Sequence, residues 1–179
     1  SLLTYAFDII ASDETELPAE RRIELVTRLA RAAGLGGMAG GQFLDLTAER
    51  QTPGEEGILR LQAMKTGALI RFACEAGAIV GQASPADRER LAEFGSAVGL
   101  AFQLADDLLD LTSDAATLGK AAGKDAAAGK ATLAGLHGID WTRRQLSGLM
   151  DQASDLLRPF GAAGTMLRTA ARFVVERNH

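Results

Sequence analysis

The sequence has little cysteine and no long hydrophobic run, and each absence excludes a class of protein. Its single cysteine, Cys74, cannot form an intrachain disulfide and fits a reducing compartment, so we expect a cytoplasmic protein. No apolar run approaches the roughly 20 residues that cross a bilayer. The first residues also lack the basic-then-apolar order of a signal peptide. Cys74 lies in an apolar helical segment, which favours a buried core position over a nucleophile.

An excess of positive charge is missing as well. The formal net charge is −4, so the chain has no general attraction for nucleic acid or for an acidic membrane surface. Basic side chains that bind an anion must therefore form a local and specific site.

Strand-like alternation is absent over any useful length, whereas helical patterns follow one another along the chain. Hydrophobic residues make up 47% of 179 residues, enough for one domain with a core. We therefore expect a single all-α domain over 1–179, an antiparallel helical bundle around a deep central cavity. The expected helices cover 2–11, 18–33, a segment from the glycine cluster at 34–41 to 50, roughly 55–80, 85–113, 139–158 and 162–177. Ser84 is the expected N-cap of the long helix, and 114–131 is the expected irregular loop.

Residues 99–114 combine a stripe of polar side chains with apolar residues on the other faces, so we expect core to surround this helix. At about 100° per residue, one face carries Gln103, Asp106, Asp107, Asp110 and Asp114. No basic residue lies three or four positions away, and a helix C-terminus disfavours negative charge. A hard cation relieves this repulsion, and Mg²⁺ held by carboxylates and a phosphate is the commonest arrangement. The alternative interpretation is a solvated acidic stripe on an amphipathic helix.

Lysines surround this stripe in sequence. Lys65 lies on an apolar helix and either extends to the surface or reaches into a cavity. Its neighbour Thr66 is expected to hydrogen-bond back to its own helix and loosen it there. Lys120, Lys124 and Lys130 lie among glycines in a loop that either wraps an anion or is simply solvated. Together, carboxylates and lysines predict a site for a diphosphate whose charge is bridged by metal.

Four motifs then resemble the trans-isoprenyl diphosphate synthases. FQLADDLLD at 102–110 resembles that family's second aspartate-rich motif, and three further motifs agree in order and spacing. These are GGMAGGQFLDL at 36–46, KTG at 65–67 and LGKAAGKDAAAGKATL at 118–133. Within the family, the bacterial farnesyl diphosphate synthases, or geranyltranstransferases, are the most similar. The family's first aspartate-rich motif and its basic GKRxRP segment are absent, so the resemblance covers only the C-terminal portion of the family's length.

The resemblance implies an isoprenoid-synthase helical fold, a homodimer and a prenyl transfer. In that reaction an allylic diphosphate, dimethylallyl or geranyl, ionises, isopentenyl diphosphate attacks the carbocation, and a proton is lost. The implied cofactor is Mg²⁺, with Mn²⁺ as a substitute. Positive charge stabilises the departing diphosphate, and a dry cavity protects the carbocation from water.

The resemblance also assigns roles residue by residue. It makes Asp106 the principal Mg²⁺ ligand, with Asp107 and Asp110 as further ligands or holders of metal-bound water. It assigns the diphosphate to Lys65, Lys120 and Lys130. It assigns the carbocation to the neutral oxygens of Thr66 and Gln103, and it places Phe102 beside isopentenyl diphosphate. Gln42 and Asp45 are implied to be structural supports. His137 and His179 match no catalytic position and are interpreted as surface or packing residues, and Trp141 as a packing anchor.

The chain begins inside an expected helix without a methionine, which suggests a fragment or a processed chain. Because the sequence carries only half of the family's metal site, we expect no turnover by this chain alone. Proteolysis, a shortened sequence or a natural split with a partner chain would each explain the missing half. The leading hypothesis is the C-terminal part of a short-chain isoprenyl diphosphate synthase. A non-catalytic diphosphate-binding subunit of the same fold is the alternative. A class I terpene cyclase ranks below both because no NSE-type triad accompanies the aspartates.

Overall fold

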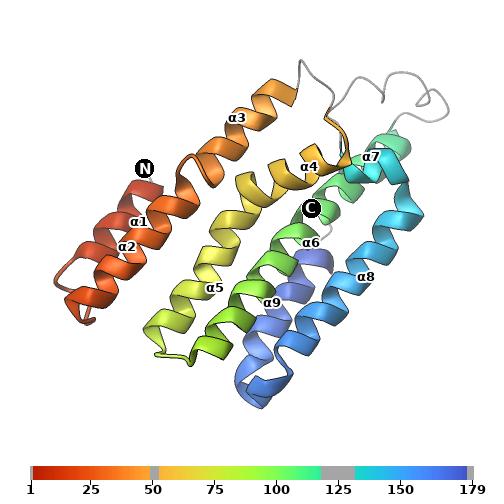
Figure 1. Cartoon of the computed structure of the whole chain (residues 1–179). Helices are drawn as coiled ribbons and strands as arrows, with labels where there is room; N and C mark the ends of the chain where they lie inside the picture. Colours follow the sequence, from red (N-terminus) through yellow and green to blue (C-terminus); the bar gives the residue numbers. More distant parts are fainter. Residues whose placement is uncertain (1, 49–52, 118–131, 177–179) are drawn as a thin grey trace.

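The computed structural model describes residues 2–48, 53–117 and 132–176, and within these ranges every regular element is a helix (Figure 1). The elements are α1 (Leu2–Ala11), α2 (Ala19–Ala33), α3 (Met38–Ala48), α4 (Glu55–Gln62), the π-helical turn η1 (Ala63–Gly67), α5 (Ala68–Val80), α6 (Pro85–Thr117), α7 (Leu133–His137), α8 (Ile139–Leu156), the 3₁₀ segment η3 (Arg158–Gly164) and α9 (Thr165–Glu176). The expected all-α fold is confirmed.

The long helix α6 is the element around which the bundle is arranged. It lies between α5 and α8, and α9 packs against both α6 and α8 (Figure 1). On the other side of α5, the helices α1 and α2 form a hairpin at the edge of the molecule, followed by α3. The acidic motif therefore lies on the helix with neighbours on several sides.

Two clusters of buried side chains hold the bundle, and α6 contributes to both. The first joins α4, α6, α7 and α8 through Ile58, Ala101, Leu104, Ala105, Leu133 and Leu146, with Trp141 packed against it. The second joins α6, α8 and α9 through Phe94, Val98, Ala153, Leu157 and Ala171. Burying a leucine fully contributes about 1.5–3 kcal/mol. These clusters fix which face of α6 is buried, and Trp141 has the packing position expected of it.

The long helix begins as predicted but ends later. Ser84 is its N-cap, because its hydroxyl accepts a hydrogen bond from the Asp87 backbone N–H at 3.2 Å. The helix continues to Thr117, so the assignment of 114–117 to a loop was wrong. Ala115 and Ala116 favour helix, and no glycine lies between Ser113 and position 119, so nothing local ends the helix at Ser113. Lys120, Lys124 and Lys130 lie outside the described residues.

Three other boundaries also differ from the predictions. The segment 55–80 is interrupted by η1 rather than being one α-helix. The short helix α7 was not predicted, although the Thr132 hydroxyl caps it by accepting from the Gly135 N–H at 3.0 Å. The last helix begins at Thr165 rather than 162, because η3 precedes it and Gly161 adopts a positive φ of 53°. Within the described ranges, no helix is both long and apolar enough to span a membrane.

Candidate functional site

The π turn η1 carries the KTG motif, and two helices approach it closely through glycines. A Cβ on Gly41 of α3 would lie 2.2 Å from the backbone nitrogen of Lys65, and one on Gly99 of α6 would lie 2.9 Å from Cα of Gly67. Such distances exclude any side chain at the two positions. The backbone of η1 is thus enclosed by α3 and α6. Single π turns occur frequently at functional sites.

Lys65 is held from α3. Its Nζ lies 2.5 Å from Oδ2 of Asp45, a charge-assisted hydrogen bond between side chains that are 31% and 15% exposed. Asp45 belongs to the GQFLD part of the motif at 36–46, for which the resemblance implied a supporting role. The ammonium group therefore has a fixed position beside the turn and stays partly open to solvent.

Thr66 and Gln103, predicted to act together, are in direct contact. The Thr66 hydroxyl donates a hydrogen bond to Oε1 of Gln103 at 2.6 Å. The expectation that Thr66 bonds back to its own helix was wrong, because Gly99 allows α6 to come near enough for Gln103 to accept instead. This bond joins the KTG turn to the helix of the acidic motif.

A second bond joins the end of α4 to α6, through a residue that the sequence did not single out. Nε2 of Gln62, the last residue of α4, donates to Oδ2 of Asp107 at 3.1 Å. Gln62 is only 5% exposed. It follows Ile58 by four positions and so occupies the buried face of α4, where an apolar residue is expected. That break in the apolar pattern is the signal that could have identified it.

The acidic motif is only partly enclosed. Asp106 and Asp107 are half-buried, whereas Asp110 is exposed, so the expectation that core surrounds the whole stripe was wrong for Asp110. No group of three Asp, Glu, His or Cys side chains among the described residues is arranged to hold a metal by itself. Mg²⁺ in phosphate sites typically uses one or two carboxylates, with waters and phosphate oxygens completing its shell. The hard oxygens of Asp106 and Asp107 fit that kind of site.

The remaining predicted residues divide into described and undescribed ones. Phe102 is half-buried on α6 and Gln42 is exposed on α3. His137 stacks on Trp141 with ring centroids 4.3 Å apart, and its Nε2 lies 3.3 Å from Glu55, in line with a packing role. Lys120, Lys130 and His179 lie outside the described residues.

Cys74 has the environment of a core residue. Burial raises the pKa of its thiol to about 11, and the neighbouring Glu75 adds to this. Nucleophilic thiols require a lowered pKa. The interpretation of Cys74 as a packing residue therefore agrees with its position on α5.

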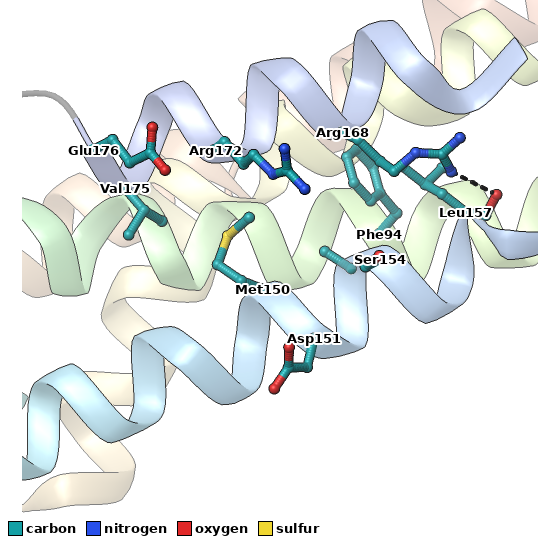
Figure 2. A pocket seen from close by; sticks show the side chains of 10 residues that line it. Phe94, Met150, Asp151, Ser154, Leu157, Arg168, Arg172, Val175 and Glu176 are labelled. Atoms are coloured by element: carbon teal, nitrogen blue, oxygen red, sulfur yellow. Dashed lines mark hydrogen bonds between the residues drawn. The ribbon is translucent and has the colours of Figure 1, made fainter. Parts of the chain in front are cut away.

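Two cavities lie away from the KTG turn. One, of about 270 Å³, lies between α6, α8 and α9, and Figure 2 shows Arg168 of α9 donating a hydrogen bond to the carbonyl of Leu157 beside it. The other, of about 210 Å³, lies between α2, α5 and α6. None of the residues lining either cavity is a predicted site residue, so neither is the central cavity expected beside the acidic motif.

Comparison with known proteins gives consistent matches. The family model of polyprenyl synthetases matches residues 1–156. Farnesyl diphosphate synthase of Escherichia coli is 37% identical over 187 residues, which cover 99% of this chain and 61% of the relative. Geranylgeranyl diphosphate synthase of Cyanophora paradoxa is 33% identical, with 100% and 60% covered. The crystal structure of an FPP/GFPP synthase from Zymomonas mobilis superposes with a TM-score of 0.83 at 40% identity, over 96% of this chain and 57% of that one. The chain thus spans about three fifths of these relatives' length.

Proposed function

The chain belongs to the polyprenyl synthetase family, and on that premise we propose that it forms the part of a short-chain isoprenyl diphosphate synthase that carries the second aspartate-rich motif. The reaction is the head-to-tail condensation of an allylic diphosphate with isopentenyl diphosphate. The observation that carries the proposal is the convergence at η1, where Thr66 and Gln62 bond to Gln103 and Asp107 of α6.

The diphosphate is the first charge that the site has to stabilise. Lys65, whose position Asp45 fixes, is proposed to bind the allylic diphosphate. Lys120 and Lys130 are proposed to bind it as well. Asp106 and Asp107, with Asp110 beside them, would hold magnesium or its waters. Magnesium, when bound, supplies positive charge to the departing diphosphate. A lysine held in place before the reaction needs little reorganisation when that charge develops.

The allylic carbocation is the second charge that the site has to stabilise. Because the Thr66 hydroxyl donates its hydrogen bond to Oε1 of Gln103, the lone pairs of the hydroxyl oxygen can face positive charge. A neutral oxygen stabilises a carbocation without forming an ion pair with it. Phe102, one residue before Gln103, is proposed to lie beside isopentenyl diphosphate. We further propose a cytoplasmic homodimer.

The alternative function is a diphosphate-binding subunit or fragment of the same fold that does not turn over alone. The chain spans about three fifths of the relatives' length. Both functions require the diphosphate site, and they differ only in whether this chain releases product without a further segment or partner.

Calorimetry of the whole chain with Mg²⁺ and inorganic pyrophosphate tests the shared site. We expect pyrophosphate to bind only with Mg²⁺, and Lys65→Gln to weaken it, whereas the control Arg144→Gln on exposed α8 binds as the wild type does. Binding that ignores both Mg²⁺ and Lys65 would refute the proposal. A separate incubation with geranyl and isopentenyl diphosphates distinguishes the functions: steady product release identifies an enzyme complete in itself, and none identifies the subunit.

A further inference from the structure

Gln62 presents an unusual buried carboxamide. It ends α4 immediately before η1, it is 5% exposed, and its neighbour on the same face, Ile58, is 1% exposed. Its Nε2 donates to Asp107, but its Oε1 is buried without a hydrogen-bond partner. Leaving a buried polar atom unpaired destabilises a folded protein. Such an atom in a folded protein calls for an explanation, such as a water or an ion.

The carboxylate determines which way the amide points. An ionised aspartate only accepts hydrogen bonds, so the NH₂ group of Gln62 must face Asp107. The opposite orientation would set the amide oxygen against the carboxylate oxygen. The unpaired Oε1 is therefore held in one direction, next to the acidic motif, for as long as Asp107 is charged. A methionine would fill the same space without an unpaired oxygen, but it would remove this donor from Asp107.

We propose that Gln62 is a positioning residue of the acidic motif: its Nε2 fixes the carboxylate of Asp107, and its Oε1 accepts a hydrogen bond from a water bound to the magnesium–diphosphate. This inference rests on the proposed function. Magnesium dehydrates reluctantly and keeps several waters, whose hydrogens need acceptors. Partners that orient the ligands of a metal contribute to its affinity although they do not touch it.

The test compares three side chains at position 62 in the whole chain, with Mg²⁺ and inorganic pyrophosphate as the calorimetric probe. Gln62→Met keeps the volume and removes both polar groups, and we expect about 10- to 100-fold weaker pyrophosphate binding. Gln62→His supplies one donor and one acceptor as a neutral imidazole, so binding should stay within about threefold of the wild type. Gln152→Met, at an exposed glutamine of α8, is the control and should bind as the wild type does.

Thermal melting without ligand separates packing from hydrogen bonding. Wild-type affinity in a folded Gln62→Met chain overturns the inference, and so does equal loss in the His and Met variants. Should Gln62→Met not fold, Gln62→Asn takes its place, because it keeps an amide too short to reach Asp107; wild-type affinity there also overturns the inference. If the wild type itself binds no pyrophosphate with Mg²⁺, the proposed function fails. That outcome differs from one in which the wild type binds and substitution of Gln62 leaves the affinity unchanged.

Discussion

Nζ of Lys65 and Oδ2 of Asp45 lie 2.5 Å apart, so the lysine of the KTG turn is held by α3 and not by the acidic motif on α6. Twenty residues separate the two in the chain. The pair is therefore a tertiary contact, and it gives the GQFLD segment a definite physical task. It also shows why the diphosphate site, as proposed, needs at least three helices at once.

Asp45→Asn tests this pair by removing the charge and keeping the shape. Because both side chains are mostly buried, we expect the free energy of unfolding in urea to fall by about 1 kcal/mol, with a smaller effect at high salt. The control is Asp155→Asn, whose partner Arg158 is exposed like Asp155 itself. It should change little, and an equal loss in both variants would contradict a specific role for Asp45.

Gly41→Ala tests the approach of α3 to η1. The new methyl group would meet backbone atoms of Lys65 at 2.2 and 2.5 Å, which cannot move aside as a flexible side chain can. We expect destabilisation of about 1–3 kcal/mol, measured by thermal or urea unfolding. Gly148→Ala in α8 has nothing within 4 Å and should instead stabilise by about 0.5–1 kcal/mol. The same sign for both substitutions would show that the contact is not tight.

The Thr66–Gln103 bond can be measured by a double-mutant cycle. Thr66→Val and Gln103→Leu each remove one partner, and their stability effects should be non-additive by about 0.5–1.5 kcal/mol. Thr47→Val is the comparison, since the Thr47 hydroxyl bonds to the Phe43 carbonyl within α3. Its effect on stability should simply add to that of Gln103→Leu. Additivity in both cycles would show that Thr66 and Gln103 are not coupled.

Cys74 should resist alkylation. With a pKa raised from 9.0 to about 11, its thiolate fraction at pH 8 is about 100-fold below that of the unfolded chain, and iodoacetamide should react correspondingly slowly. Because the folded-state pKa is the higher one, folding favours the protonated thiol, and this stability is lost as pH rises from 9 through 11. Equal alkylation of native and urea-unfolded chains at pH 8 would contradict the burial.

Residues that begin or end helices made much of the fold predictable. Pro18, Gly34 and the Ser84 cap mark helix ends through their own backbone geometry or side chain, and the structure has helix ends at or next to each. The π turn could not be found in that way. It coincides with close approaches by Gly41 and Gly99 from distant parts of the chain, and no pattern within 55–80 records those contacts.

The site was predictable where a motif places its residues together and less so elsewhere. Thr66 and Gln103 were assigned to the same charge and lie in contact, whereas the partner of Lys65 depends on how α3 crosses η1. Gln62 was not predicted as a site residue because its polar side chain interrupts an apolar stripe without belonging to any motif. Asp110 was placed wrongly because helical periodicity gives the direction of a side chain but not what covers it.

The π turn also sets a length requirement on the segment between Gln62 and Ala68. Each residue of an α-helix turns the chain by about 100°, so inserting one more residue here would rotate all of α5 by about that amount relative to α4. Phe72, Ala78 and Ile79 would then swing from the interior toward water. Insertions should consequently be tolerated in the links between helices but not within these five residues.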